Sequence, residues 1–121
     1  MHIHVFDQDW LMDKIGKRLA EMYLTMTYYV YRITIVQAFE TLAKNKLTEN
    51  HTESILIFLS EAARDVVANV RLAAVSALRT VAAYAEDLAI ANLVKPVVNE
   101  LASNDPDIDV QAMLAQSALV L

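Results

Sequence analysis

The sequence predicts an all-α fold, an α-α superhelix of about three helical hairpins, and three observations favour this class. The chain has 121 residues, of which 56% are hydrophobic, so it can bury a core and lacks the composition of a disordered segment. One glycine, two prolines and no cysteine exclude a turn-rich β-protein, a disulfide scaffold and a thiolate metal site. A segment pattern also recurs every 39 or 40 residues, which is the period of helical-hairpin repeats.

The recurring pattern consists of three segments that each open a predicted helix. They read TYYVYRITIVQAF (27–39), VVANVRLAAVSAL (66–78) and PDIDVQAMLAQSA (106–118). Arg32, Arg71 and Gln111 occupy equivalent positions in them. The predicted units are a lead segment (1–9) and hairpins at 10–47, 48–86 and 87–121.

The first hairpin begins with a helix whose apolar residues recur at helical spacing: Leu11, Ile15, Leu19 and Met22. Asp9 is its predicted N-cap, and a turn is expected at 25–28. The weakly charged stretch 23–43 contains too many threonines and tyrosines for a membrane span, so we expect a helix, a turn and a second helix there. The second helix has its own apolar residues, Ile33, Ile35, Phe39 and Leu42.

The second hairpin has the clearest periodicity. Its first helix is predicted over 52–63, with Asn50 and Glu53 as a capping box, and a turn is expected at 64–68. Its second helix has one apolar stripe, formed by Val70, Ala74, Ala77, Leu78 and Val81. The alanines of this stripe allow close approach of a neighbouring helix.

The third hairpin is predicted to run as a helix over 88–102, a turn at 103–107 and a helix from Ile108 to the end. Pro96 lies inside the first of these helices, where it removes a backbone donor and should bend or restart the helix.

The turn of the second hairpin, Asp65-Val66-Val67-Ala68-Asn69-Val70-Arg71, resembles the signature of HEAT repeats. Together with Trp10, Tyr29, Arg32, the run 93–96 (LVKP) and the run 105–110 (DPDIDV), it is similar to the carboxy-terminal repeats of the protein phosphatase 2A scaffold (A) subunit family. The sequence departs from that family at Thr27, where a proline is common, and at Gln111, where a basic residue is usual.

The resemblance implies a non-catalytic scaffold whose turns within the hairpins bind the phosphatase catalytic subunit. A regulatory subunit would bind repeats that are not in this sequence. The implied partner-binding residues lie in and beside the turns: Tyr28, Tyr29, Val66, Val67, Ala68, Asn69, Asp107 and Ile108. A structural ladder of charge-assisted hydrogen bonds would join Arg32, Asp65, Arg71 and Asp105. Tyr31 aligns with Val70 and Val110, so we expect it in the core.

Charge and motifs point away from other functions. Ten Lys and Arg against fifteen Asp and Glu give a net charge of −5, which disfavours nucleic acid and anionic membranes as partners. We expect no cofactor and no metal: His2 and His4 lack further ligands, and the run Asp105, Asp107 and Asp109 lacks the glycine and glutamate of a calcium loop. No secretory signal is visible, so the expected location is the cytoplasm, with the nucleus as a further site.

Two alternatives remain open from the sequence. One is another HEAT or armadillo adaptor of the transport-receptor type, and the other is a HEAT-like nucleic-acid repair enzyme, which the net negative charge disfavours. The first helix also has a broad apolar surface that includes Trp10, Met12 and Ile15. That surface predicts a missing upstream repeat or self-association.

Overall fold

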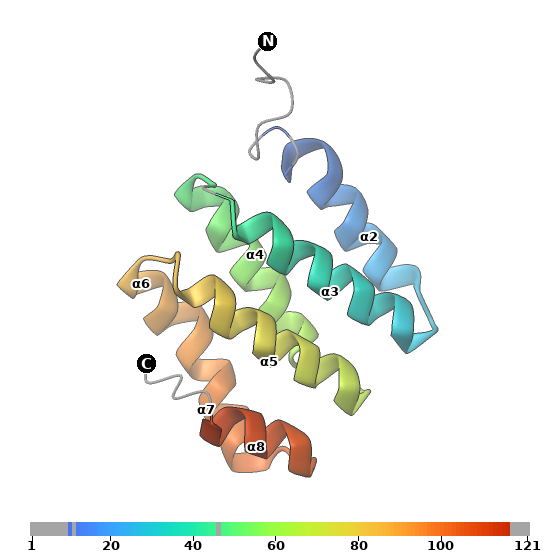
Figure 1. Ribbon diagram of the computed structural model, residues 1–121, viewed down its shortest axis with the longest axis vertical. Coiled ribbons are helices and arrows are strands. Elements are labelled where there is room, and N and C mark those ends of the chain that lie inside the picture. Colours follow the sequence, from blue (N-terminus) through green and yellow to red (C-terminus); the bar gives the residue numbers. More distant parts are fainter. Residues whose placement is uncertain (1–9, 11, 46, 117–121) are drawn as a thin grey trace.

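In the described residues of a computed structural model (10, 12–45 and 47–116), every regular element is helical, which confirms the all-α prediction (Figure 1). The elements in chain order are η2 (Met12–Gly16), α2 (Lys17–Thr25), α3 (Tyr29–Ala43), α4 (Glu49–Ala62), α5 (Ala68–Ala82), α6 (Asp87–Ala89), η3 (Ile90–Val94), α7 (Lys95–Asn104) and α8 (Ile108–Gln116). The two η elements are single π-helical turns.

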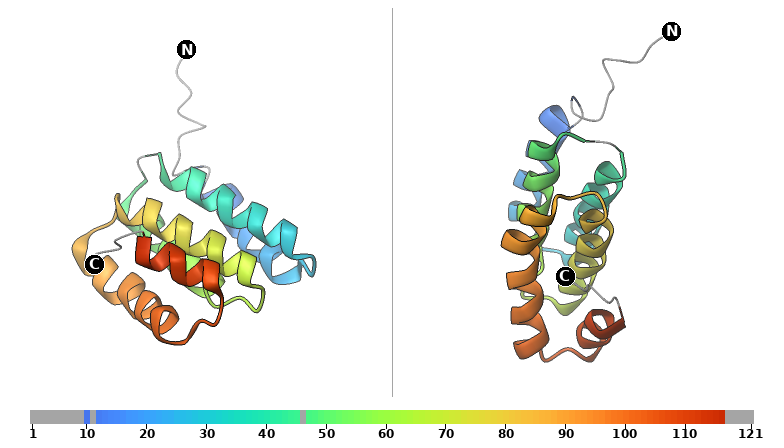
Figure 2. Two further views of the ribbon diagram at one scale, coloured as in Figure 1. Left: turned by 60° about the horizontal axis from the view of Figure 1, so that its bottom comes forward. Right: turned by 90° about the vertical axis from the view of Figure 1, so that its left-hand side faces the viewer.

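The helices lie in two layers (Figure 2). One layer holds α2, α4 and the run from α6 to α7, and the other holds α3, α5 and α8. Within the second layer α5 packs against both α3 and α8, while in the first layer α4 packs against η3. Each helix of the first layer also contacts the helix that follows it in the second. The core therefore lies between the layers.

The apolar stripe of α5 forms the centre of this core. Val70, Ala74, Ala77, Leu78 and Val81 are all fully buried, as their spacing predicted. Facing them from α4 are Ile55, Leu56, Leu59 and Ala62, which are also fully buried. The aromatic rings of Phe39 and Phe58 meet at 4.3 Å between centroids and extend the core toward α2.

The first helix differs from its prediction because a π-helical turn comes directly before α2. That turn contains more residues than an α-helical turn, so it rotates the side chains that precede α2. Met12 is buried and Ile15 is 41% exposed, whereas the expected apolar stripe included Ile15. Leu11 and Asp9, the expected stripe residue and N-cap, lie outside the described residues.

Helix α4 begins at Glu49, three residues before the predicted start. Thr48 is its N-cap, with an extended backbone and a side-chain oxygen that accepts a hydrogen bond from the His51 N–H at 3.5 Å. The predicted capping box at Asn50 and Glu53 is therefore wrong, because both residues already lie inside the helix. The expected turn at 64–68 is confirmed to within a residue, since α4 ends at Ala62 and α5 begins at Ala68.

Pro96 restarts a helix, as predicted. It lies in the first turn of α7, and the π-helical turn η3 comes directly before it. The hydroxyl of the buried Ser60 on α4 donates a hydrogen bond of 3.1 Å to the Leu93 carbonyl in η3. The third hairpin is thereby tied to the second next to the irregular turn.

The weakly charged stretch 23–43 folds as the end of α2, a turn and α3, as expected. Within the described part of the chain, none of the helices combines the length and the apolar character that a membrane crossing requires.

Candidate functional site

The three turns within the hairpins lie along one edge of the molecule, which we call the turn edge (Figure 1). These turns span 26–28, 63–67 and 105–107, between α2 and α3, α4 and α5, and α7 and α8. All of the expected partner-binding and ladder residues lie in these turns or in the first turn of the following helix.

Arg32 and Asp65 join the first turn to the second. The guanidinium donates two parallel hydrogen bonds to the carboxylate, from Nε to Oδ2 at 2.9 Å and from Nη2 to Oδ1 at 3.0 Å. The side chains are only 11% and 7% exposed, so water competes little for this pair. Arg32 also donates from Nη1 to the carbonyls of Met26 and Thr27, both at 3.0 Å, so it closes its own turn.

Arg71 and Asp105 repeat this arrangement one hairpin further along. Nε lies 2.7 Å from Oδ2 and Nη2 lies 3.0 Å from Oδ1, and the side chains are 13% and 1% exposed. Nη1 donates to the carbonyls of Asp65 and Val66, at 3.0 and 3.2 Å. The four residues of the expected ladder thus form two bidentate ion pairs, which we call the ladder.

Gln111 occupies the equivalent position in the third hairpin, where it binds only the backbone carbonyls of its own hairpin. Its side-chain amide donates to the carbonyls of Leu101 at 2.8 Å and Asp105 at 2.9 Å. A glutamine carries no charge for a further carboxylate, and no such pair forms in the described part of the chain. At the other end, Met26 stands where the later turns have Asp65 and Asp105.

Both aspartates also shape their own turns. Asp65 Oδ1 accepts from the Val67 N–H, and Asp105 Oδ1 accepts from the Asp107 N–H, each at 2.9 Å. Such a bond to the backbone two residues on is typical of an aspartate that starts a turn.

These contacts set the protonation of the ladder. Burial acts to raise the pKa of Asp65, but hydrogen bonds from Arg32, Tyr23 and the Val67 N–H outweigh it and hold that pKa below its usual range. The hydrogen bond from Arg71 lowers the pKa of Asp105 against a smaller opposing effect of burial. Both carboxylates therefore stay ionised at neutral pH.

Tyr23 is a ladder contact that the sequence analysis missed. Its hydroxyl donates to Asp65 from α2, while its ring packs edge-on against Phe58. Burial and the bond to Asp65 raise the pKa of Tyr23. No local pattern could have revealed it, because the contact joins residues 42 positions apart.

Apolar side chains stand exposed along the turn edge beside the ladder. Val66 is 90% exposed and Ile108 is 80% exposed, and Tyr28 is exposed as well. The remaining expected binding residues are less uniform: Tyr29, Val67, Ala68 and Asp107 are half-buried, and Asn69 is exposed.

Tyr31 is exposed, so the prediction that it lies in the core is wrong. Its ring packs edge-on against Tyr28, which also contacts Tyr29 in the same way, with centroids 5.4 and 5.5 Å apart. The aligned Val70 and Val110 are buried because α5 and α8 each pack on the second-layer helix before them. Among the described residues no second-layer helix precedes α3.

Asp107 has a structural task in the third turn. Its Oδ2 accepts from the N–H groups of Asp109 at 3.1 Å and Val110 at 3.0 Å, which caps the start of α8. Asp105 is therefore engaged in pairing and Asp107 in capping, while Asp109 is exposed in the first turn of α8. Within the described ranges no group of three or more His, Cys, Asp or Glu could hold a metal ion, and His2 and His4 lie outside those ranges.

In a comparison with known proteins, no protein-family model matches the chain, and no curated protein matches it significantly.

Proposed function

We propose that this protein is a non-catalytic scaffold module, a solenoid of three HEAT-type hairpins that binds a partner protein along its turn edge. The observation behind this proposal is the ladder of two buried bidentate ion pairs beside exposed apolar side chains. The buried charged groups of this edge hold one turn against the next, which supports a structural task for them.

The ladder supports a rigid binding edge. Each arginine spans two turns, because it binds the carbonyls of its own turn and the carboxylate of the next. Rigidity of this kind lowers the conformational entropy lost when a partner binds.

The exposed apolar residues supply the contact area. Val66 is exposed in the second turn, Ile108 is exposed at the start of α8 directly after the third turn, and Tyr28 is exposed in the first turn. Burying exposed apolar side chains against a partner is favourable, and tyrosine is among the residues that contribute most to the binding energy of interfaces.

The proposed partner is the catalytic subunit of protein phosphatase 2A, on the strength of the sequence resemblance. In such a complex the module would position the catalytic subunit and take no part in phosphoester chemistry. The uneven burial of the turn residues refines which side chains would contact it: Tyr28, Val66 and Ile108 are more accessible than Tyr29 and Val67.

The test is binding of the purified catalytic subunit to the wild-type chain and to Val66→Asp and Ile108→Asp, measured by isothermal titration calorimetry. We expect each variant to bind at least about tenfold more weakly, because a charge replaces an apolar contact at the interface. Ile57→Asp is the matched control: Ile57 is also exposed but lies on the first-layer helix α4, away from the turns, so binding should be unchanged.

Wild-type affinity in both turn variants, with unchanged helical circular dichroism, would show that the turn edge is not the binding surface. Failure of the wild-type chain to bind the catalytic subunit would instead refute the choice of partner.

A further inference from the structure

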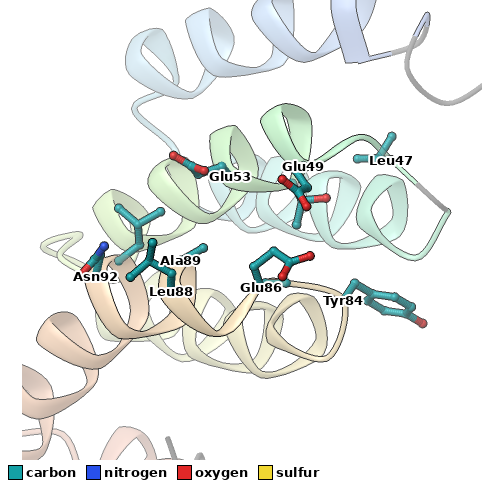
Figure 3. A pocket seen from close by; sticks show the side chains of 11 residues that line it. Leu47, Glu49, Glu53, Tyr84, Glu86, Leu88, Ala89 and Asn92 are labelled. Carbon is teal, nitrogen blue, oxygen red and sulfur yellow. The ribbon is translucent and has the colours of Figure 1, made fainter.

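A cleft of about 560 Å³ opens at the end of the molecule opposite the turn edge (Figure 3). It lies between the start of α4 and the connection from α5 to α6, where the second hairpin passes into the third. Glu49, Glu53 and Glu86 line it together with Leu47, Tyr84 and Leu88. None of these residues belongs to the ladder or to the exposed turn residues, so the cleft is a separate surface.

The charge of the cleft is one-sided. Three carboxylates line it, and none of the described lining residues is basic. Glu49 and Glu86 come close enough to hydrogen-bond, and that bond together with the like charge of Glu49 raises the pKa of Glu86. Two carboxylates from different elements therefore lie close together, and a nearby positive charge would offset their repulsion.

Thr52 gives an independent indication of a ligand. The residue is only 8% exposed and lines the cleft, yet its hydroxyl forms no hydrogen bond with the rest of the described chain. Since no fully buried side-chain polar atom in that part of the chain lacks a partner, the Thr52 oxygen must reach the open space of the cleft. It is thus a nearly buried polar group that faces the cleft without a protein partner.

The walls limit the chemistry of the occupant. Leu88 is 71% exposed, so an apolar stem could pack on it while a charged head meets the carboxylates. A bare metal ion does not fit, because within the described ranges no three acidic or histidine side chains are grouped closely enough to hold one. Arginine and lysine side chains combine an aliphatic stem with a cationic head.

We propose that this cleft binds an arginine or lysine side chain of an extended segment of a partner protein. The aliphatic stem packs on Leu88. The charged head donates hydrogen bonds to Glu53 and Glu86 and to the Thr52 hydroxyl. This site is independent of the proposed scaffold function, because it uses the opposite end of the hairpins.

The experiment uses the full chain and two short peptides of alternating leucine and arginine, acetylated and amidated, in one of which every arginine is replaced by citrulline. Citrulline keeps the shape of arginine and removes its charge. Binding is measured by ¹H–¹⁵N correlation spectra. We expect the arginine peptide to shift the amides of residues 47–53 and 84–93 and to bind at least about tenfold more tightly than the citrulline peptide.

Variants of the chain test which carboxylates bind the arginine peptide. The double variant Glu53→Gln, Glu86→Gln should bind the arginine peptide about tenfold more weakly than wild type, because two charge-assisted hydrogen bonds are lost. Glu61→Gln is the control, since Glu61 is exposed on the same helix α4 but does not line the cleft. Glu49 is left intact, because as the first residue of α4 it also interacts favourably with the helix dipole.

Equal binding of the two peptides, or wild-type affinity in the double variant, would overturn the proposal. So would amide shifts confined to residues outside the cleft. The thermal melting curve of the double variant serves as the folding check, and because both substitutions are at exposed positions we expect no loss of helix.

Discussion

Single residues with two tasks hold the turn edge together. Asp65 and Asp105 each accept a backbone N–H of their own turn and a guanidinium from the preceding hairpin. Arg32 and Arg71 likewise bind one turn through Nη1 and the next through Nε and Nη2. Removing one of these side chains therefore disturbs both a turn and the contact between turns.

Asp105→Asn should destabilise the protein by about 3 kcal/mol, because it leaves the Arg71 guanidinium buried without its counter-charge. The substitution keeps the shape of the side chain and the carbonyl oxygen that can accept from the Asp107 N–H. The measurement is chemical denaturation at pH 7. Asp109→Asn, at an exposed position in α8, is the control and should change the free energy of unfolding by less than about 0.5 kcal/mol.

The Arg71–Asp105 pair also makes the stability lost in Asp105→Asn depend on pH. The pKa of Asp105 is lower in the folded state than its ordinary value of 3.8, so the ionised carboxylate stabilises the fold at every pH above that value. This contribution is lost as the pH falls through the lower pKa of the folded state. The difference between wild type and Asp105→Asn should therefore be constant from pH 7 to about 5 and shrink below about 4. A difference that stays constant into strong acid would show that the ion pair is not its cause.

Whole elements differ from their predictions where the helix is irregular or where its cap lies outside the periodic stretch. The π-helical turns η2 and η3 shift which side chains face the core, and neither has a marker in the apolar pattern. Pro96 identified one of them indirectly, because its missing N–H requires a break nearby. The predicted start of α4 was too late because Asn50 and Glu53 match a capping motif, whereas Thr48, two residues before Asn50, is the N-cap.

Thr48→Ala should lower the free energy of unfolding by about 0.5–1 kcal/mol, since it removes the side-chain cap of α4. Asn50→Ala should be neutral or slightly stabilising, because alanine has the higher helix propensity inside the first turn. Thermal and urea denaturation of the two variants distinguish the caps. A larger loss for Asn50→Ala would restore the capping box that the sequence suggested.

At the scale of the whole molecule, the second hairpin is supported from both sides. Helix α5 packs against α3 and α8, and its apolar stripe is fully buried. Helix α2, in contrast, has no buried residue of its own. In stacked hairpins each unit is stabilised mainly by its neighbours, so outer units open more readily than inner ones.

Native-state hydrogen exchange followed by mass spectrometry should therefore show the slowest amides in α5 and the fastest helical amides in α2. Exchange through local opening follows the local stability of each element. Equal protection of α2 and α5 would mean that the hairpins open as a single cooperative unit. Asp105→Asn offers a further check, since it should speed exchange in α8 more than in α3.

The sequence by itself determined the helical class, the places of the turns and the buried stripe of α5. These features depend on residues close together in the sequence, because the 3.6-residue period of a helix and the turn formed by an aspartate are both local. The resemblance implied the ladder as a group, but only the tertiary structure decided that Arg32 pairs with Asp65 across 33 residues and that Tyr23 joins them. It also decided that Tyr31 is exposed and that three glutamates line one cleft. Those features depend on how one hairpin stacks on the next, and that packing is a property of the surfaces the helices present together.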